Sequence, residues 1–362
     1  MGILEVLPRE HIEAWVRAAG GRDWRVELVD YPFGTPTTLG AVRLYGDFGS
    51  LFVKVIRAYR HWPGMALMPA ELRTQALASD LWRYEADLYA DGVGALLPPG
   101  LRLPIVHAVT DLGDDHVAIV LEDVRVTDEP WDTSRFARAA GLLARAAVRI
   151  TRADALPPSA SRVPAAMLEL FYVSRLAPVE LPAWADDRTW AHPLLAPWEK
   201  ELRSDLEALA ERIPAILDRL RSLPQLMVHG DPSPQNLLVP VDAPDTFVAI
   251  DWSLGGIAPA GDDLGQLLIG LAHAGQLTAN DLPALRETIV DSFQAGLVRE
   301  GLAIPRADIA YGLDGGVLLR STFTAVPFPR LSEPMTAELA TLVQERLRLT
   351  RYLVDIGLRL PT

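Results

Sequence analysis

One short segment carries most of the side chains that could bind a metal ion or accept a proton. It runs from His229 to Asp251 and reads HGDPSPQNLLVPVDAPDTFVAID. It contains an imidazole, several carboxylates and the carboxamide of Asn236. Carboxylate and carboxamide oxygens without a thiol suit magnesium better than zinc or copper. These residue types therefore predict an oxygen-rich cation site.

The local pattern suggests how these side chains could meet. The loop DPSP contains two prolines, which disfavour helix at the residues before them, so Asp231 is expected in an irregular loop. Two short apolar strands are expected at residues 237–239 and 247–250, joined by the turn PVDAPDT. If these strands pair as a hairpin, Asp251 returns beside Asp231 and Asn236.

The spacing HxDxxxxN, followed by an aspartate after a strand, is the phosphoryl-transfer layout of protein kinases. The sequences HGDPSPQNLL and AIDW together resemble the aminoglycoside phosphotransferase and choline kinase-like family of small-molecule kinases, which have a protein-kinase-like fold. An Asx-rich surface hairpin is the alternative. The apolar strands on both sides of the polar loop argue against it.

The resemblance implies a role for each residue of the segment. Asp231 would be the catalytic residue that accepts the proton of the acceptor hydroxyl. Asn236 and Asp251 would hold Mg²⁺ on the nucleotide phosphates. His229 is expected to brace the loop through hydrogen bonds. Asp263, in GDDLGQLL, matches an aspartate that braces the catalytic loop of the family.

The strand SLFVKVI places a lysine among apolar neighbours on one face. A buried ammonium needs a partner or a ligand phosphate, so Lys54 is a candidate nucleotide contact. A helix is expected over residues 72–89, and Glu85 lies along its apolar stripe. Glu85 is therefore the candidate partner, with Glu71 as the alternative. The resemblance assigns Lys54 to the α- and β-phosphates of ATP or GTP, whereas a snorkelling edge lysine is the structural alternative.

The segment pattern predicts an α+β chain with two lobes, as in the protein-kinase-like fold that the resemblance implies. A small N-lobe is expected to hold a helix and an antiparallel five-stranded sheet, with strands at residues 24–30, 40–45, 50–56, 104–109 and 116–121. Further along, helical periodicity covers residues 136–150 and 202–220. Pro214 is expected to kink or split the second helix. We expect an N-lobe at 1–123 and a larger, mostly helical C-lobe at 124–362.

Two N-lobe segments are candidates for nucleotide contacts. In the family, sequences like LEDV occupy the hinge between the lobes, which implies base recognition by backbone groups of Glu122, Asp123 and Val124. The turn PFGTPTT at residues 32–38 either aims N–H groups at phosphate oxygens or is a plain hairpin tip. The chain contains no GxxxxGK, GxSxG or HExxH motif.

The segment 171–200 is rich in Trp, Pro and Asp and is expected to be irregular. In the family this neighbourhood helps to wall the acceptor site, and tryptophan rings can stack on a cation. Core packing of the tryptophans is the favoured alternative. The candidate substrate contacts are Trp184, Asp186, Asp187, Trp190 and, further along the chain, Asp262.

Composition narrows the classes of partner. The 362 residues carry a net charge of −13, which disfavours binding to nucleic acid and to anionic membranes. This acidity favours a cationic acceptor only weakly, because solubility explains it equally well. The absence of cysteine excludes disulfides and thiolate metal sites. With no signal peptide and no apolar run near the roughly 18 residues of a membrane span, a soluble cytoplasmic protein is expected.

The expected reaction is magnesium-dependent transfer of the γ-phosphoryl group of ATP or GTP to a hydroxyl of a small molecule. An aminoglycoside-like or nucleoside-like antibiotic is the first candidate acceptor, with resistance as the outcome, and a sugar, amino alcohol or amino acid is the second. A nucleotide sensor without turnover is disfavoured, because Lys54, Asp231, Asn236 and Asp251 are all present. A protein kinase is disfavoured because no APE-type activation segment follows Asp251.

Overall fold

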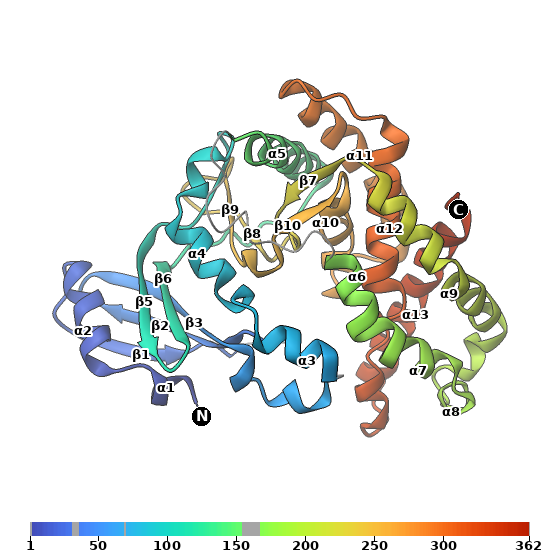
Figure 1. Cartoon of the computed structure of the whole chain (residues 1–362), viewed down its shortest axis with the longest axis horizontal. Coiled ribbons are helices and arrows are strands. Elements are labelled where there is room, and N and C mark those ends of the chain that lie inside the picture. Colours follow the sequence, from blue (N-terminus) through green and yellow to red (C-terminus); the bar gives the residue numbers. More distant parts are fainter. Residues whose placement is uncertain (1, 31–35, 69, 154–166, 362) are drawn as a thin grey trace. The chain divides into compact units, whose positions relative to one another are not determined.

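A computed structural model describes residues 2–30, 36–68, 70–153 and 167–361 (Figure 1). The chain divides into two compact units. Unit 1 contains the described residues of Met1–Asp128 and Leu238–Ser253, with Ala153. Unit 2 contains the described residues of Glu129–Arg152, Pro164–Leu237 and Leu254–Thr362. The segment Leu238–Ser253 therefore folds with the N-terminal part of the chain, although we expected that part to end at residue 123.

Unit 1 is built on the predicted five-stranded antiparallel sheet. Its strand order is β1–β2–β3–β6–β5. The strands are β1 (Trp24–Leu28), β2 (Thr38–Gly46), β3 (Gly49–Arg57), β5 (Val106–Gly113) and β6 (His116–Glu122). The helices of this unit are α1 (Ile3–Val6), α2 (Arg9–Ala18), α3 (Ala70–Leu77) and α4 (Tyr84–Ala90). Strand β3 is central, with Lys54 opposite Ala41 of β2 and Ile119 of β6.

The two faces of the sheet bury different groups. Helix α2 packs Trp15 into a core that also contains Val53 and Val55 of β3. Because neighbouring residues of a strand point to opposite faces, Lys54 points away from this core. On that second face the Lys54 ammonium meets Glu85 of α4. The mixed α+β class predicted from the sequence is confirmed.

The helix expected over residues 72–89 is interrupted, so its predicted extent was wrong. Helix α3 ends at Leu77, and a 3-10 helix at Leu81–Arg83 precedes α4. Leu77, expected in a buried stripe, is 53% exposed. The Ser79 hydroxyl accepts a hydrogen bond from the Leu81 N–H at 3.1 Å. A serine that binds nearby backbone competes with helix continuation, which accounts for the break.

A second, three-stranded sheet joins distant parts of the sequence. Strand β9 (Phe247–Ala249) pairs in parallel with β4 (Leu101–Arg102) and has β8 (Leu237–Leu238) as its other neighbour. The strands expected at 237–239 and 247–250 are present, each one residue shorter. Strand β4 was not predicted, because two residues carry too little pattern. Its pairing with β9 places Asp251 in unit 1.

Unit 2 is mostly helical, as predicted. Its long helices are α5 (Thr133–Thr151), α9 (Glu199–Ser222), α10 (Asp262–His273), α11 (Leu282–Arg299), α12 (Arg306–Val317) and α13 (Ala337–Arg359). Strand β7 (Gln225–Val228) pairs antiparallel with β10 (Gly256–Pro259). Asp132 caps the start of α5, because its carboxylate accepts a hydrogen bond from the Arg135 N–H at 2.8 Å. None of the described helices combines the length and apolar character that crossing a bilayer requires.

Packing overrides two local signals in unit 2. Pro214 does not split α9, because Ile213 and Ile216 beside it are fully buried and hold the helix against its neighbours. The segment 171–200, expected to be irregular, is largely helical, so this prediction was wrong. It follows α6 (Met167–Phe171) and contains a π-helix (Tyr172–Glu180), α7 (Leu181–Ala185) and α8 (Asp187–Trp190).

The close approach of α11 to α5 at Gly296 predicts that a larger residue there destabilises the fold. A Cβ atom at Gly296 would lie 2.4 Å from the Gly141 carbonyl oxygen and 2.8 Å from the Ala144 methyl group. We expect Gly296→Ala to lower the free energy of unfolding by about 1–3 kcal/mol in denaturant titrations. The control Ala295→Leu, on the exposed side of α11, should stay within about 0.5 kcal/mol. Equal losses in both variants would contradict this packing.

Candidate active site

Three charged side chains of unit 1 meet at one point. The Lys54 ammonium lies 2.6 Å from a Glu85 carboxylate oxygen and 3.0 Å from an Asp251 carboxylate oxygen. The Lys54 and Glu85 side chains are 7% and 3% exposed, whereas that of Asp251 is 34% exposed. The predicted partner of Lys54 is thus Glu85 rather than Glu71. Strand β3, helix α4 and the segment after β9 each supply one charge.

Burial and pairing act in opposite directions on these charges. Burial disfavours the Lys54 ammonium, but the Glu85 and Asp251 carboxylates outweigh it and raise the pKa of Lys54 above its ordinary value. Burial also raises the pKa of Glu85 to about 7, although the neighbouring ammonium favours its ionised form. Lys54 is therefore charged at neutral pH. One ammonium facing two carboxylates leaves an acidic balance that suits a bound cation.

The backbone of Asp251 has an unusual conformation that directs its side chain. Its φ is 57°, in the left-handed region that non-glycine residues rarely adopt. The Ser253 hydroxyl donates to the Asp251 carboxylate oxygen that also contacts Lys54, at 2.8 Å. Strained backbone of this kind concentrates at functional sites. The conformation and the two contacts together fix this carboxylate.

The predicted catalytic loop lies in unit 2, directly after β7. Gly230 turns the chain with φ of 87°, and a Cβ atom there would lie 1.9 Å from the Leu254 carbonyl oxygen, so the position requires glycine. The Asp231 N–H donates to His229 Nδ1 at 3.3 Å. The Asn236 amide nitrogen donates to the Asp231 carbonyl oxygen at 2.9 Å. These bonds close the loop on itself.

The same hydrogen bonds show which side-chain atoms of Asn236 and His229 are used within the loop. Because a carbonyl only accepts hydrogen bonds, the Asn236 nitrogen must face it, and the Asn236 side-chain oxygen is then directed elsewhere. That oxygen can bind a cation. His229 is 1% exposed and its Nδ1 accepts a bond within the loop, which fits the predicted bracing role.

Two residues far along the chain hold the loop at Gly230. The Asp263 carboxylate accepts hydrogen bonds from the N–H groups of His229 at 3.1 Å and Gly230 at 2.8 Å, as the resemblance implied. Burial raises the pKa of Asp263 to about 7, although these two bonds favour its ionised form. Arg320, within the π-helix Leu318–Thr322, donates to the Gly230 carbonyl oxygen. Arg320 was not predicted, because an isolated arginine in a helix carries no motif.

Asp262, a candidate substrate contact, is instead buried at the start of α10. Its exposed fraction is 6%, and its Oδ1 has no hydrogen-bond partner among the described residues. Burial raises the pKa of Asp262 to about 6, and the positive charge of Arg320 offsets only part of this effect. The placement does not support direct contact between Asp262 and an acceptor.

The sequence of the loop and its surroundings matches a known family. The family model described as phosphotransferase enzyme family matches residues 102–303, more than half of the chain. The chain belongs to the phosphotransferase enzyme family. The match includes Asp231, Asn236 and Asp251, whereas Lys54 precedes it.

Solved phosphotransferase structures share the fold over nearly the whole chain. The GDP and kanamycin complex of APH(2")-IIia is 12% identical, with a TM-score of 0.52, and the alignment covers 95% of this chain and 98% of that one. Spectinomycin phosphotransferase APH(9)-Ia, in complex with ADP and spectinomycin, is 11% identical, with a TM-score of 0.53 and 98% of each chain covered. Amicoumacin kinase hAmiN, in complex with AMP-PNP, Ca²⁺ and Ami, is 12% identical, with a TM-score of 0.50 and coverage of 99% and 96%. No curated protein matches the sequence.

The predicted base-binding segment of this phosphotransferase continues β6. Glu122 is the last residue of that strand, and its N–H donates to the Ile105 carbonyl oxygen at 2.9 Å. The Glu122 carboxylate pairs with Arg102, and that of Asp123 pairs with an arginine of β2 at 3.1 Å. The Glu122 N–H is therefore already used within unit 1. Base recognition by the backbone of Asp123 and Val124 stays a prediction.

The tryptophans expected near the acceptor are core residues of unit 2. Trp184 and Trp190 are 4% and 2% exposed, with ring centroids 5.4 Å apart. Their indole N–H groups donate to the carbonyl oxygens of Phe323 at 2.9 Å and of Trp184 at 2.8 Å. The structure thus favours the packing alternative over stacking on a cationic acceptor.

The two aspartates between these tryptophans have local partners. Asp186 accepts a hydrogen bond from the Arg188 N–H at 2.9 Å at the start of α8 and pairs with the Arg188 side chain at 2.6 Å. Asp187 pairs with Arg203 at 2.6 Å. These ion pairs account for both carboxylates without a substrate.

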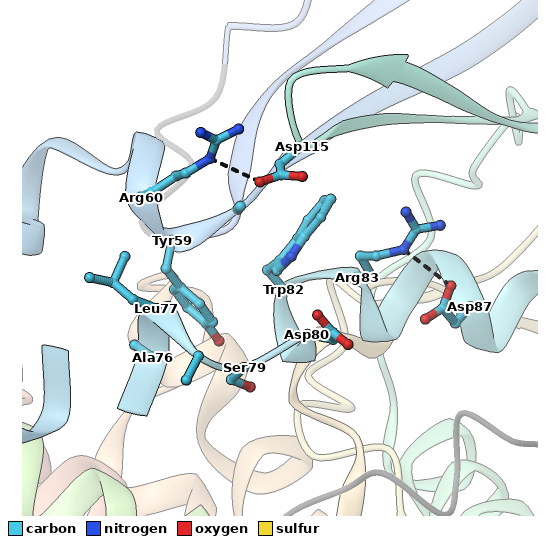
Figure 2. A pocket seen from close by; sticks show the side chains of 12 residues that line it. Tyr59, Arg60, Ala76, Leu77, Ser79, Asp80, Trp82, Arg83, Asp87 and Asp115 are labelled. Carbon is cyan, nitrogen blue, oxygen red and sulfur yellow. Dashed lines mark ion pairs between the residues drawn. The ribbon is translucent and has the colours of Figure 1, made fainter. Parts of the chain in front are cut away.

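A cavity of about 590 Å³ in unit 1 is lined by none of the predicted site residues. Figure 2 shows Tyr59, Arg60, Trp82 and Asp115 around it. The predicted phosphate turn at residues 32–38 falls mostly on residues 31–35, which lie outside the described part of the chain.

The buried Asp262 carboxyl predicts a pH-dependent stability difference. Because its pKa in the folded protein is raised from 3.8 to about 6, the folded state binds this proton more tightly than the unfolded state. The carboxylate therefore costs stability as it ionises. Asp262→Asn should gain stability relative to the native chain as pH rises from about 4 to about 7, by up to about 3 kcal/mol, and stay level above. Denaturant unfolding across this range measures the difference.

The control is Asp242→Asn, which changes an exposed aspartate between β8 and β9. Its stability relative to the native chain should not follow the same pH course. A pH-independent difference for Asp262→Asn would contradict the assignment.

Proposed function

We propose that this phosphotransferase moves the γ-phosphoryl group of ATP or GTP to a hydroxyl of a small molecule, with Mg²⁺ bound at the phosphates. The observation that supports this most directly is the Lys54 ammonium, buried yet held charged between Glu85 and Asp251. A buried positive charge beside the partly exposed carboxylate of Asp251 suits nucleotide phosphates that carry a metal ion.

Each residue has a separate task in this proposal. Asp231 orients the acceptor hydroxyl and takes its proton as the new phosphorus–oxygen bond forms and the bond to the β-phosphate oxygen breaks. Lys54, positioned by Glu85, neutralises charge on the α- and β-phosphates. Such catalysis depends on positioning and on electrostatic stabilisation. The bonds that Asp263 and Arg320 make to the loop serve this positioning.

The proposed metal ligands fit magnesium by their chemistry. Asn236 offers its side-chain oxygen, because its nitrogen is bonded to the Asp231 carbonyl. Asp251 offers a partly exposed carboxylate with a fixed direction. Hard oxygen ligands of this type suit Mg²⁺, which would neutralise developing charge on the transferred group.

An antibiotic of the aminoglycoside-like or nucleoside-like type is the first acceptor that we propose. The similar structures reported above are a kanamycin complex, a spectinomycin phosphotransferase and an amicoumacin kinase, which supports this choice over others. A sugar, amino alcohol or amino acid is the second choice, because the motifs concern the phosphoryl donor rather than the acceptor. A nucleotide sensor without turnover is the third.

Replacing the proposed base tests the reaction. The purified chain is incubated with ATP or GTP, Mg²⁺ and a panel of aminoglycosides, nucleoside antibiotics, sugars and amino alcohols, and product mass is followed. Asp231→Ala should lower kcat by about 100- to 10,000-fold on any acceptor found. Asp242→Ala, which changes an exposed aspartate between β8 and β9, should leave kcat unchanged. Nucleotide binding without product on the whole panel would favour the sensor.

Replacing the partner of Lys54 tests the phosphate site. Glu85→Gln keeps the shape of the side chain but removes one charge that holds the ammonium. It should lower kcat/KM for the nucleotide by about 10- to 100-fold, equivalent to about 1.4–2.7 kcal/mol. The control Glu71→Gln, on the exposed surface of α3, should change little. A larger effect at Glu71 would sink the assignment of the partner.

A further inference from the structure

A pair of histidines lies at the turn between β5 and β6, outside the Lys54 triad. Asp114 and Asp115 form the tip of this turn with φ of 47° and 54°, as in a type I′ hairpin. The 3-10 helix that follows β3 packs against it, because the Ala58 N–H donates to the Asp115 carbonyl oxygen at 2.9 Å. The rings of His61 and His116 have their centroids 4.5 Å apart.

Three potential metal ligands converge at this turn. One ring nitrogen of each histidine and one carboxylate oxygen of Asp114 lie within 4.8 Å of one another. Ligand atoms around a tetrahedral zinc ion stand about 3.3 Å apart, so closure on an ion needs shifts of about 1 Å. Asp114 is exposed and His61 is half-buried, so both side chains have room to make these shifts.

The Asp114 carbonyl oxygen orients both rings. It lies 2.8 Å from His61 Nε2 and 2.8 Å from His116 Nδ1. Each neutral ring donates one N–H to this oxygen and keeps its other nitrogen as an acceptor. A backbone carbonyl that fixes the tautomer in this way is the usual companion of a metal-binding histidine.

His116 provides an independent indication of a ligand. The residue is 1% exposed, and its Nε2 has no hydrogen-bond partner among the described residues. Buried nitrogens normally have a partner.

The surrounding charges favour a cation. Arg60 contacts Asp114 Oδ1 at 2.6 Å and the Asp115 carboxylate at 2.9 Å, and the second contact is visible in Figure 2. Asp114 Oδ2, the other oxygen, lies 3.7 Å from His61 Nε2. Arg60 thus holds one oxygen and leaves the other on the side of the His61 ring, as outer partners of ligating carboxylates do. Two carboxylates and one guanidinium leave one negative charge.

We propose that His61, His116 and Asp114 form a binding site for a divalent transition-metal ion of the zinc class, separate from the magnesium ligands of the phosphoryl-transfer site. Two imidazoles and a carboxylate suit zinc better than magnesium or calcium, which prefer oxygen ligands. A water molecule would complete the coordination. The ion would join the segment after β3 to the β5–β6 turn and so stabilise unit 1.

Metal binding to the full chain tests the proposal without any nucleotide or acceptor. Chelator-treated protein is titrated with Zn²⁺ by calorimetry and with Co²⁺ by visible absorption, and its melting temperature is recorded with and without Zn²⁺. We expect one ion per chain and a rise in melting temperature. His61→Ala and Asp114→Asn should each weaken binding by about 10-fold or more.

Matched variants separate this site from others. His107→Ala removes an exposed histidine of β5 and should bind zinc like the native chain. Asn236→Ala combined with Asp251→Asn removes the proposed magnesium ligands and should also keep zinc binding. The variant His61→Ala decides the outcome if His116→Gln does not fold, because His61 is only half-buried. Native-like zinc binding by His61→Ala and Asp114→Asn, or no saturable binding by the native chain, would overturn the proposal.

Discussion

The buried Lys54 ammonium imposes the strictest requirement on unit 1. An ammonium at this depth would lose its proton unless carboxylates compensated for the lost water. The central position of β3 buries Lys54, and α4 supplies Glu85. The pairing of β9 with β4 brings in Asp251, which lies 197 positions from Lys54 along the chain. The five-stranded sheet, helix α4 and the β4–β9 pair are therefore all needed to hold the Lys54 ammonium charged.

In unit 2 the requirement is to provide hydrogen-bond partners for the backbone of an irregular loop. The loop before Asn236 has no regular hydrogen-bond ladder, so each of its backbone groups needs an individual partner. Asp263 accepts hydrogen bonds from two N–H groups, and Arg320 donates to the Gly230 carbonyl oxygen that follows them. The glycine at 230 allows this approach, because any Cβ would strike the Leu254 carbonyl. The loop is held by contacts from two helices of its own unit.

Local pattern was sufficient for some of these features and not for others. Strand alternation and an apolar helical stripe predicted the meeting of Lys54 with Glu85, because both signals act within a few residues. The break at Ser79 and the burial of Trp184 were missed or left open, since they depend on which face finds a neighbour. Arg320 could not be predicted, because its role comes from a π-helical turn and a contact across 90 positions.

The left-handed backbone of Asp251 has a consequence for how this chain can change by mutation. Asparagine and glycine adopt this conformation about as readily as aspartate, so either could replace it with little backbone strain. The carboxylate would be lost, and Glu85 alone would remain beside the Lys54 ammonium. A single substitution could therefore yield a folded chain without its proposed metal ligand. The fold thus constrains the backbone conformation of residue 251 but does not require a carboxylate there.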